Sequence, residues 1–316
     1  MTLATHVRTL GRGPGRSRSL TREEAREAMG LMLSGADPHA VGALLMLLRM
    51  KGETAEEIAG LAEAAQAATG PLPPIDLDWP SYAAGRTRGL PWFLLAAKLV
   101  ADSGRRVLMH GWNGPDGAVR TGVAALNIPV ATTTEGAKTA LEAGNLVYMP
   151  LEEMHPALFS LLSLRGVLGL RSCANTVCRM LNPGRARASV QGVFHPSYRL
   201  LQADAAQLLA WESLSVIKGG GGEFERHPGK GVEAFGLRGG ARWQASLPEL
   251  IDDQMRLGDL TFPMTALEAL WARDEAPTFA RAMVLGTAAL ALETLGDSGD
   301  ADDLWHQRTR ALPEKV

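Results

Sequence analysis

Arginine is concentrated in one stretch of this chain that has no carboxylates to neutralise it. Residues 154–203 contain no Asp or Glu, although the whole chain has a formal charge of only −2. The arginines in this stretch are Arg165, Arg171, Arg179, Arg185, Arg187 and Arg199. A guanidinium group donates several coplanar N–H groups and is suited to hold phosphate oxygens in pairs. The stretch therefore predicts a surface that binds phosphate-bearing ligands.

Further basic residues extend this prediction. Lys218 follows the predicted strand 213–217 at the edge of a sheet, and the family resemblance given below implies the same edge for Arg86 and Arg88. Ligands of open α/β sheets bind beyond the carboxyl ends of the strands. The predicted phosphate-binding set is Arg86, Arg88, Arg165, Arg171, Arg179, Arg185, Arg187 and Lys218. DNA would suit such a face, with an affinity that falls steeply as salt rises. The competing interpretation is that helical arginines only solvate a face or contact C-terminal carbonyls.

The composition limits the class of protein. The chain has 316 residues, of which 46% are hydrophobic and 21% charged, as in an ordinary globular protein with room for two lobes. It contains neither an apolar secretory signal nor an uninterrupted run of about 18 apolar residues, which predicts a cytoplasmic protein with no membrane partner. Cys173 and Cys178 have no neighbouring Cys or His to complete a metal site. We therefore expect no metal.

The pattern of elements changes near residue 72. The first part predicts helices, with capping boxes at Thr21–Glu24 and Thr54–Glu57, and Pro71–Pro74 ends it. Beyond this point strands alternate with helices, which is typical of βαβ units and a mainly parallel sheet. The predicted strands are 106–109, 128–130, 146–149, 189–190 with 193–194, and 213–217.

The sequence thus predicts an α/β fold with a small all-helical N-terminal lobe and a large lobe with a mainly parallel sheet flanked by helices. The helical lobe comprises residues 1–72, and the helical stretch 154–186 is expected to pack onto it. The α/β lobe comprises residues 75–150 and 187–316.

Three stretches carry a resemblance to a known family. Residues 41–58 (VGALLMLLRMKGETAEEI) look like the N-terminal helical domain of anthranilate phosphoribosyltransferase and its glycosyltransferase family 3 relatives. Leu170–Ser172, Asn175–Thr176, Leu181–Pro183 and Gly192–Val193 resemble a second diagnostic stretch, and His110–Gly111 matches part of a third. The resemblance covers nearly the whole chain and implies the fold described above.

The resemblance also implies which chemistry is altered. The family displaces pyrophosphate from phosphoribosyl pyrophosphate with Mg²⁺, a glycine-rich loop, a Lys and an acidic pair. Here SYAAGRTRG (81–89) replaces the loop, Met109 replaces the Lys, and Glu223-Phe224 retains one carboxylate of the pair, with Glu225 following. These changes would remove most of the stabilisation of transition-state charge, so no catalytic residue is expected. Arg171 matches the arginine that binds the aromatic acid in the family.

These departures make the chain similar to a non-biosynthetic branch of the family, the YbiB type. That resemblance implies a homodimer, formed through the N-terminal helices, that binds nucleic acid with weak sequence preference and needs no cofactor. DNA is therefore the expected partner.

Two alternatives stay open. The chain could be a divergent pentosyltransferase or phosphoribosyltransferase with an altered substrate and a need for Mg²⁺, so its status as an enzyme is undecided, although we favour a non-enzymatic role. The remnant substrate pocket would then be lined by His110, Gly111, Asn113, Arg171 and Glu223. A scaffold protein that binds a protein partner through its helical lobe is the third interpretation.

Overall fold

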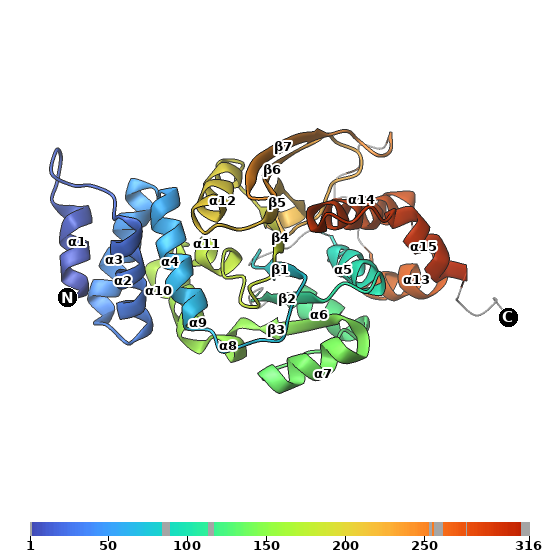
Figure 1. The fold of residues 1–316 in the computed structure, drawn as a ribbon, viewed down its shortest axis with the longest axis horizontal. Coiled ribbons are helices and arrows are strands. Elements are labelled where there is room, and N and C mark those ends of the chain that lie inside the picture. Colours follow the sequence, from blue (N-terminus) through green and yellow to red (C-terminus); the bar gives the residue numbers. More distant parts are fainter. Residues whose placement is uncertain are drawn as a thin grey trace.

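The N-terminal lobe is a bundle of helices. The computed structural model describes residues 2–83, 89–112, 117–252, 255, 262–275 and 277–310. The bundle contains α1 (Leu3–Gly11), α2 (Arg22–Leu33), α3 (Pro38–Lys51) and α4 (Ala55–Ala67), which lie at one end of the molecule (Figure 1). Both predicted capping boxes are formed: Thr21 pairs with Glu24 at the start of α2, and Thr54 with Glu57 at the start of α4.

A seven-stranded sheet forms the centre of the larger lobe. Its order is β3-β2-β1-β4-β5-β6-β7, and the strands from β3 to β5 run parallel, whereas β6 and β7 are antiparallel. The strands are β1 (Leu77–Ser81), β2 (Val107–Gly111), β3 (Leu146–Pro150), β4 (Ala188–Val193), β5 (Ser213–Lys218), β6 (Val232–Arg238) and β7 (Ala241–Leu247). The α/β class and mainly parallel sheet predicted from the sequence are confirmed.

Helices flank this sheet. They are α5 (Phe93–Asp102), α6 (Ala118–Ala125), α7 (Thr134–Gly144), α12 (Ser197–Leu208), α13 (Thr265–Arg273), α14 (Thr278–Leu295) and α15 (Ala301–Arg310). Helix α14 packs against α5, β4 and β5. It is long and apolar enough to cross a membrane, yet 72% of that stretch is buried, as expected of a core helix.

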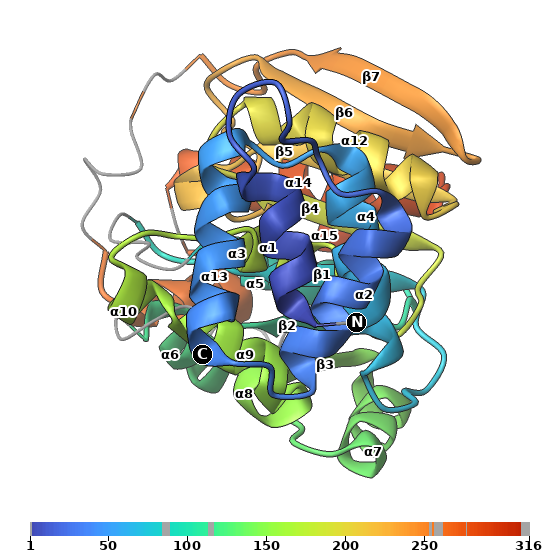
Figure 2. The ribbon, with the colours of Figure 1, turned by 90° about the vertical axis from the view of Figure 1, so that its left-hand side faces the viewer.

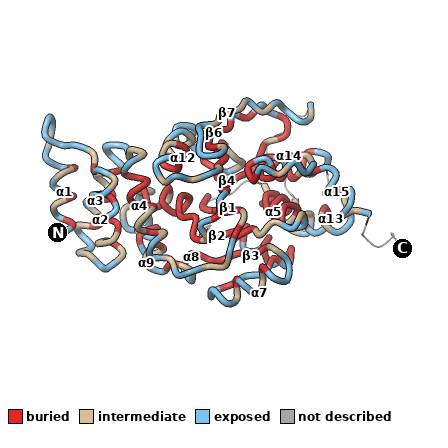
Figure 3. Tube along the Cα trace, in the orientation of Figure 1, coloured by how far each residue is buried: buried red, intermediate tan, exposed pale blue. Residues whose placement is uncertain are grey.

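Residues 151–179 form short helices that join the two lobes. They are α8 (Leu151–Met154), α9 (Pro156–Ser163), α10 (Arg165–Leu168) and α11 (Ala174–Arg179). Leu158, Leu161 and Cys178 share one hydrophobic core with α1–α4, and that core continues through Val193 and Val216 of the sheet. Figures 2 and 3 show these helices beside the bundle, with the buried part of the chain continuing into the sheet.

Two predicted elements have different outcomes. The strand predicted at residues 128–130 is wrong, because only an isolated bridge between Val130 and Tyr148 forms there. Pro129 has no N–H to donate to a ladder, which explains the interruption. The helical stretch 154–181 was predicted with interruptions near Gly166 and Gly169. The one at Gly169 is confirmed, because this residue ends α10 with a φ of 70°, whereas Gly166 lies inside α10.

Candidate functional site

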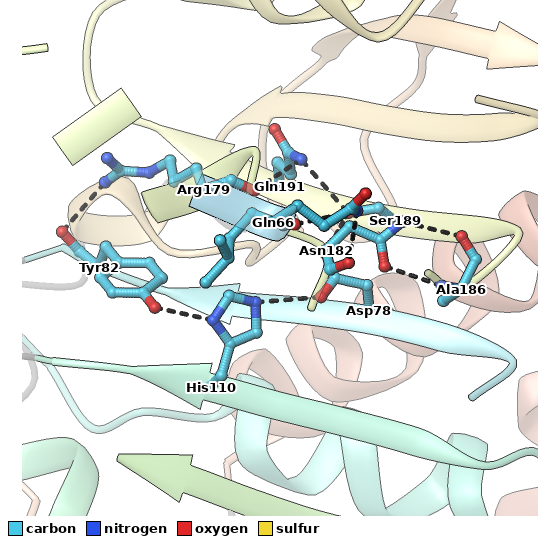
Figure 4. A network of polar contacts seen from close by, with 10 residues as sticks. Gln66, Asp78, Tyr82, His110, Arg179, Asn182, Ala186, Ser189 and Gln191 are labelled. Atoms are coloured by element: carbon cyan, nitrogen blue, oxygen red, sulfur yellow. Dashed lines mark hydrogen bonds and ion pairs between the residues drawn. The ribbon is translucent and has the colours of Figure 1, made fainter. Parts of the chain in front are cut away.

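A buried polar network lies where β1 and β2 run side by side. The hydroxyl of Tyr82 lies 2.7 Å from Nδ1 of His110, and Nε2 of His110 lies 3.0 Å from Oδ1 of Asp78. Ser189 Oγ donates to the other carboxylate oxygen of Asp78 at 2.8 Å. All four side chains are fully buried (Figure 4). His110 of β2 thus has polar contacts with Asp78 of β1 and with Tyr82, which follows β1, so it holds the two strands together.

Aromatic side chains on and near β1 pack into a hydrophobic core. Trp79 and Trp92 are buried, and Trp79 meets Phe224 edge to face with ring centroids 5.5 Å apart. Met109, at the position of the family's Lys, is also completely buried. A Cβ atom on Gly111 would lie 2.0 Å from the Ser81 carbonyl oxygen. We call this region, defined by Trp79, Tyr82, Met109 and His110, the β1–β2 end. The rings of Tyr82 and His110 meet edge to face with centroids 5.4 Å apart, and Trp79 and Met109 share one hydrophobic core.

The two carboxylates at and beside the family's metal-binding position are used inside the protein. Glu223 accepts a hydrogen bond from the Ala83 N–H at 3.0 Å, and Glu225 accepts one from the Phe93 N–H at 3.1 Å. Each glutamate is only 1% exposed. Both therefore hold the backbone on either side of the segment that follows β1. Among the described residues, no group of three or more His, Cys, Asp or Glu side chains could hold a metal ion.

A separate cavity of about 360 Å³ opens between the helical bundle and the sheet. We call it the arginine cavity. Its lining residues are Arg49, Arg165, Gly169, Leu170, Arg171, Ser172, Asn175, Thr176, Arg179, Val193, Phe194, His195, Tyr198 and Gln202. Within the described part of the chain, no Asp or Glu lines it. Four segments supply the arginines: α3, α10, the turn from α10 into α11, and α11 itself.

The positive charges of the cavity act on one another. Burial, followed by the like charges of Arg165 and Arg49, lowers the pKa of Arg171. Arg49 is fixed in place, since its Nη1 donates to the Arg171 carbonyl oxygen at 2.6 Å. Glu53, whose own pKa is raised chiefly by burial, hydrogen-bonds to Tyr198. The arginines thus repel each other in a setting that favours an anionic ligand.

Arg179 connects the cavity to the β1–β2 end. Its Nε donates to the Gly192 carbonyl oxygen at 2.9 Å, its Nη2 to that of Tyr82 at 3.2 Å, and its Nη1 to that of Asn175 at 3.3 Å. The residue is buried, and desolvation lowers the pKa of its guanidinium. Because these donors already have backbone partners, Arg179 supports the cavity wall.

The residues of the predicted phosphate-binding set lie in different parts of the structure. Arg165, Arg171 and Arg179 meet in the arginine cavity, and exposed Lys218 lies level with Val193 of the cavity wall in the β4–β5 register. Arg185 and Arg187 instead precede β4, so the expectation of one continuous arginine face needs correction. A six-residue strand spans about 20 Å, which separates its two ends.

Those two arginines have other surroundings. Arg185 lines a groove with Glu23, Glu27 and Glu63, and Arg187 Nη2 donates to the Leu295 carbonyl oxygen at 3.2 Å. Arg86, Arg88 and Asn113 lie outside the described residues.

The residues predicted to line the remnant substrate pocket also lie in different places. His110, Gly111 and Glu223 belong to buried packing, whereas Arg171 lines the arginine cavity. Sequence reasoning missed Arg49, Phe194, His195 and Tyr198 as cavity residues. Arg49 lies inside the stretch 41–58 and was detectable there only as part of a helix.

Comparison with known proteins decides the family. The helical bundle domain of the glycosyl transferase family matches residues 6–69, and the α/β domain of the same family matches residues 94–239. The chain belongs to the glycosyltransferase family 3 superfamily. Neither match includes residues 70–93, which contain β1 and Trp92.

Similar proteins include several anthranilate phosphoribosyltransferases. That of Novosphingobium aromaticivorans is 28% identical, with 96% of this chain and 94% of the relative covered. That of Roseiflexus castenholzii is 30% identical over 66% of this chain and 62% of its own length. The chain spans about three fifths of the length of this relative and of two Rhizobium relatives.

Solved structures of this family share the fold. The anthranilate phosphoribosyltransferase of Thermus thermophilus superposes with a TM-score of 0.78 at 22% identity, covering 97% of this chain and 93% of that one. The Saccharomyces cerevisiae protein in complex with PRPP and Mg gives 0.76 at 15% identity, covering 97% and 94%. The superfamily membership indicated by the sequence motifs is confirmed.

Proposed function

We propose that this glycosyltransferase family 3 protein binds nucleic acid, with DNA as the expected form, through the arginine cavity and does not transfer phosphoribose. The observation that carries the proposal is the convergence of Arg49, Arg165 and Arg171 on a cavity whose described lining has no acidic side chain. Arg165 is exposed and has no hydrogen-bond or ion-pair partner among the described residues. Phosphate oxygens would relieve the repulsion among these guanidinium groups.

The β1–β2 end supports the second claim of the proposal, that the protein does not transfer phosphoribose. Transfer from phosphoribosyl pyrophosphate needs backbone N–H groups around the pyrophosphate and carboxylates for Mg²⁺. In this chain Trp79 and Tyr82 fill the end of β1, and Glu223 and Glu225 accept backbone hydrogen bonds. Both glutamates are therefore already engaged inside the fold.

We also propose that the protein acts in the cytoplasm as a homodimer that pairs through its helical lobe. Met50 of α3 is 80% exposed and Val167 of α10 is 82% exposed. These helices are adjacent, because a Cβ on Gly42 would lie 3.6 Å from Leu168 Cδ2. Light scattering should give a dimer mass, and M50K with V167K should give a monomer. An unchanged mass would exclude this face.

Binding is tested with labelled DNA and fluorescence anisotropy at low salt. If three arginines contact phosphates, affinity should fall roughly 20- to 40-fold between 50 and 200 mM salt. Arg165→Ala should lower the log–log salt slope by about 1. Arg187→Ala is the matched control, since it removes an exposed arginine at the opposite end of β4. No binding at low salt, or equal effects of the two variants, would remove the proposal.

The divergent transferase remains the second candidate, and the names of the relatives favour it. It is tested by incubating the protein with Mg²⁺, phosphoribosyl pyrophosphate and anthranilate or other aromatic acids, and measuring released pyrophosphate. Turnover that disappears in Arg171→Ala would establish it. The proposed function predicts none.

A further inference from the structure

The wall of the arginine cavity contains an aromatic ring that the fold does not bury. Phe194 follows β4 directly and is 57% exposed. It is the only aromatic among the exposed large hydrophobic side chains of the described residues. Its one ring neighbour in this part of the chain is His195, with centroids 5.0 Å apart in an edge-to-face contact. An apolar ring left in water loses the free energy of burial that a ligand could supply.

We infer that the arginine cavity receives one unpaired nucleotide of a DNA strand, with its base stacked on Phe194 and its phosphates on Arg49, Arg165 and Arg171. This inference rests on the proposed function and assigns the form of nucleic acid. The residues that carry it line one cavity together. Flat bases on aromatic rings, beside cations that follow the backbone, are the usual means of binding single strands.

The surroundings of Phe194 suit a planar ligand. Leu170, 46% exposed, lines the same cavity and provides a second apolar surface. The strand end that carries Phe194 is held on both sides, because Val193 pairs with Lys218 of β5 and Arg179 Nε donates to the Gly192 carbonyl oxygen. The ring therefore projects from a fixed strand end, which reduces the entropy lost when a base stacks on it.

The size of the cavity and the physics of base pairing favour a single strand. A volume of about 360 Å³ lies near the lower limit for small-ligand sites, so it suits one nucleotide better than several. In a duplex both faces of each base are already stacked. A duplex would have to extrude a base into the cavity, which costs a few kcal/mol.

The experiment compares three labelled oligonucleotides of ten residues at one low salt concentration: oligothymidylate, an abasic strand and a duplex. The wild type should bind oligothymidylate most tightly. Phe194→Ala should weaken that binding about 5- to 150-fold and leave abasic binding unchanged, because stacking is lost while phosphate contacts remain. Phe194→Trp should retain or strengthen it. Val130→Ala, which trims an equally exposed apolar side chain outside the cavity, is the matched control.

The outcomes separate this inference from the proposed function. If the wild type binds all three DNAs equally, or Phe194→Ala binds oligothymidylate like the wild type, the stacking assignment is overturned while nucleic-acid binding stands. If thymidine monophosphate competes as well per nucleotide as the strand, the ligand is a free nucleotide and the strand assignment is overturned. If no DNA binds, both proposals fall. Equal melting temperatures of the variants exclude misfolding as the cause.

Discussion

The β1–β2 end and the arginine cavity lie close together in one fold, yet they satisfy their polar groups in opposite ways. In the first, Tyr82, His110 and Asp78 bond to one another in complete burial. In the second, Arg165 and Arg171 repel each other across a cavity. Polar groups that bond to each other stabilise the fold, whereas like charges gathered at an opening gain from a ligand. The difference indicates where recognition takes place.

The largest loss of stability should come from removing a large side chain of the β1–β2 end. Trp79→Ala removes a fully buried ring, which should lower the free energy of unfolding by about 3–5 kcal/mol. Chemical denaturation followed by circular dichroism measures this change. DNA affinity of the folded protein should stay unchanged, because Trp79 does not line the cavity. Weaker DNA binding by the folded variant would show that the two regions are not independent.

Arg179 tests the boundary between the two regions. Arg179→Met leaves the Gly192, Tyr82 and Asn175 carbonyl oxygens without their donor, which should cost about 2 kcal/mol of stability. Arg171→Met should instead weaken DNA binding with a much smaller loss of stability. Denaturation and anisotropy on both variants separate the roles. The opposite pattern would make Arg179 the ligand-binding residue.

A smaller loss of stability should follow from removing one hydroxyl group of the β1–β2 end. Tyr82→Phe removes the hydrogen bond to His110 while keeping the ring, so the free energy of unfolding should fall by about 1 kcal/mol. Tyr198→Phe is the control within the arginine cavity, where the side chain is only half-buried. Denaturation of the two variants is the measurement. If Tyr198→Phe proved the more damaging, the cavity would be the more rigid region.

The sequence predicted what depends on local pattern. The capping boxes at Thr21 and Thr54 fixed two helix starts, and alternation of strands with helices indicated the parallel sheet. The hairpin of β6 and β7 was absent from the prediction. Its shorter apolar alternation includes Gly236 and Arg238, which gave a weak strand pattern.

The site depended on contacts that no local pattern encodes. Asp78 meets His110 only through the register of β1 on β2, and Glu225 reaches Phe93 across 132 positions of the chain. Arg179 and Arg187 are close in sequence but lie at opposite ends of β4. Arg179 bonds to Gly192 near the last residue of the strand, whereas Arg187 directly precedes its first residue. Charge counting along the sequence therefore placed Arg185 and Arg187 on the wrong side.

The smallest effect should arise in the helical lobe, away from both regions. The Arg18 guanidinium hydrogen-bonds to Glu24 at 2.6 and 2.7 Å and lowers the pKa of that carboxyl from 4.5 to about 2, with help from the Thr21 N–H. Between these pH values the unfolded chain binds a proton that the folded chain does not. Stability contributed above pH 4.5 is therefore lost as pH falls towards 2. Arg18 is more than half exposed, so water screens the pair and the loss should be below half that of Tyr82→Phe.

Denaturation at pH 5 and pH 3 measures this loss, and Glu24→Gln is the control because it cannot titrate. The wild type should lose slightly more stability than the variant between the two pH values. A larger difference would mean that the helical lobe depends on charge pairing. That outcome would weaken the contrast between buried bonding and repelling arginines, since a solvent-exposed pair would then rival the network of Tyr82, His110 and Asp78 in holding the fold.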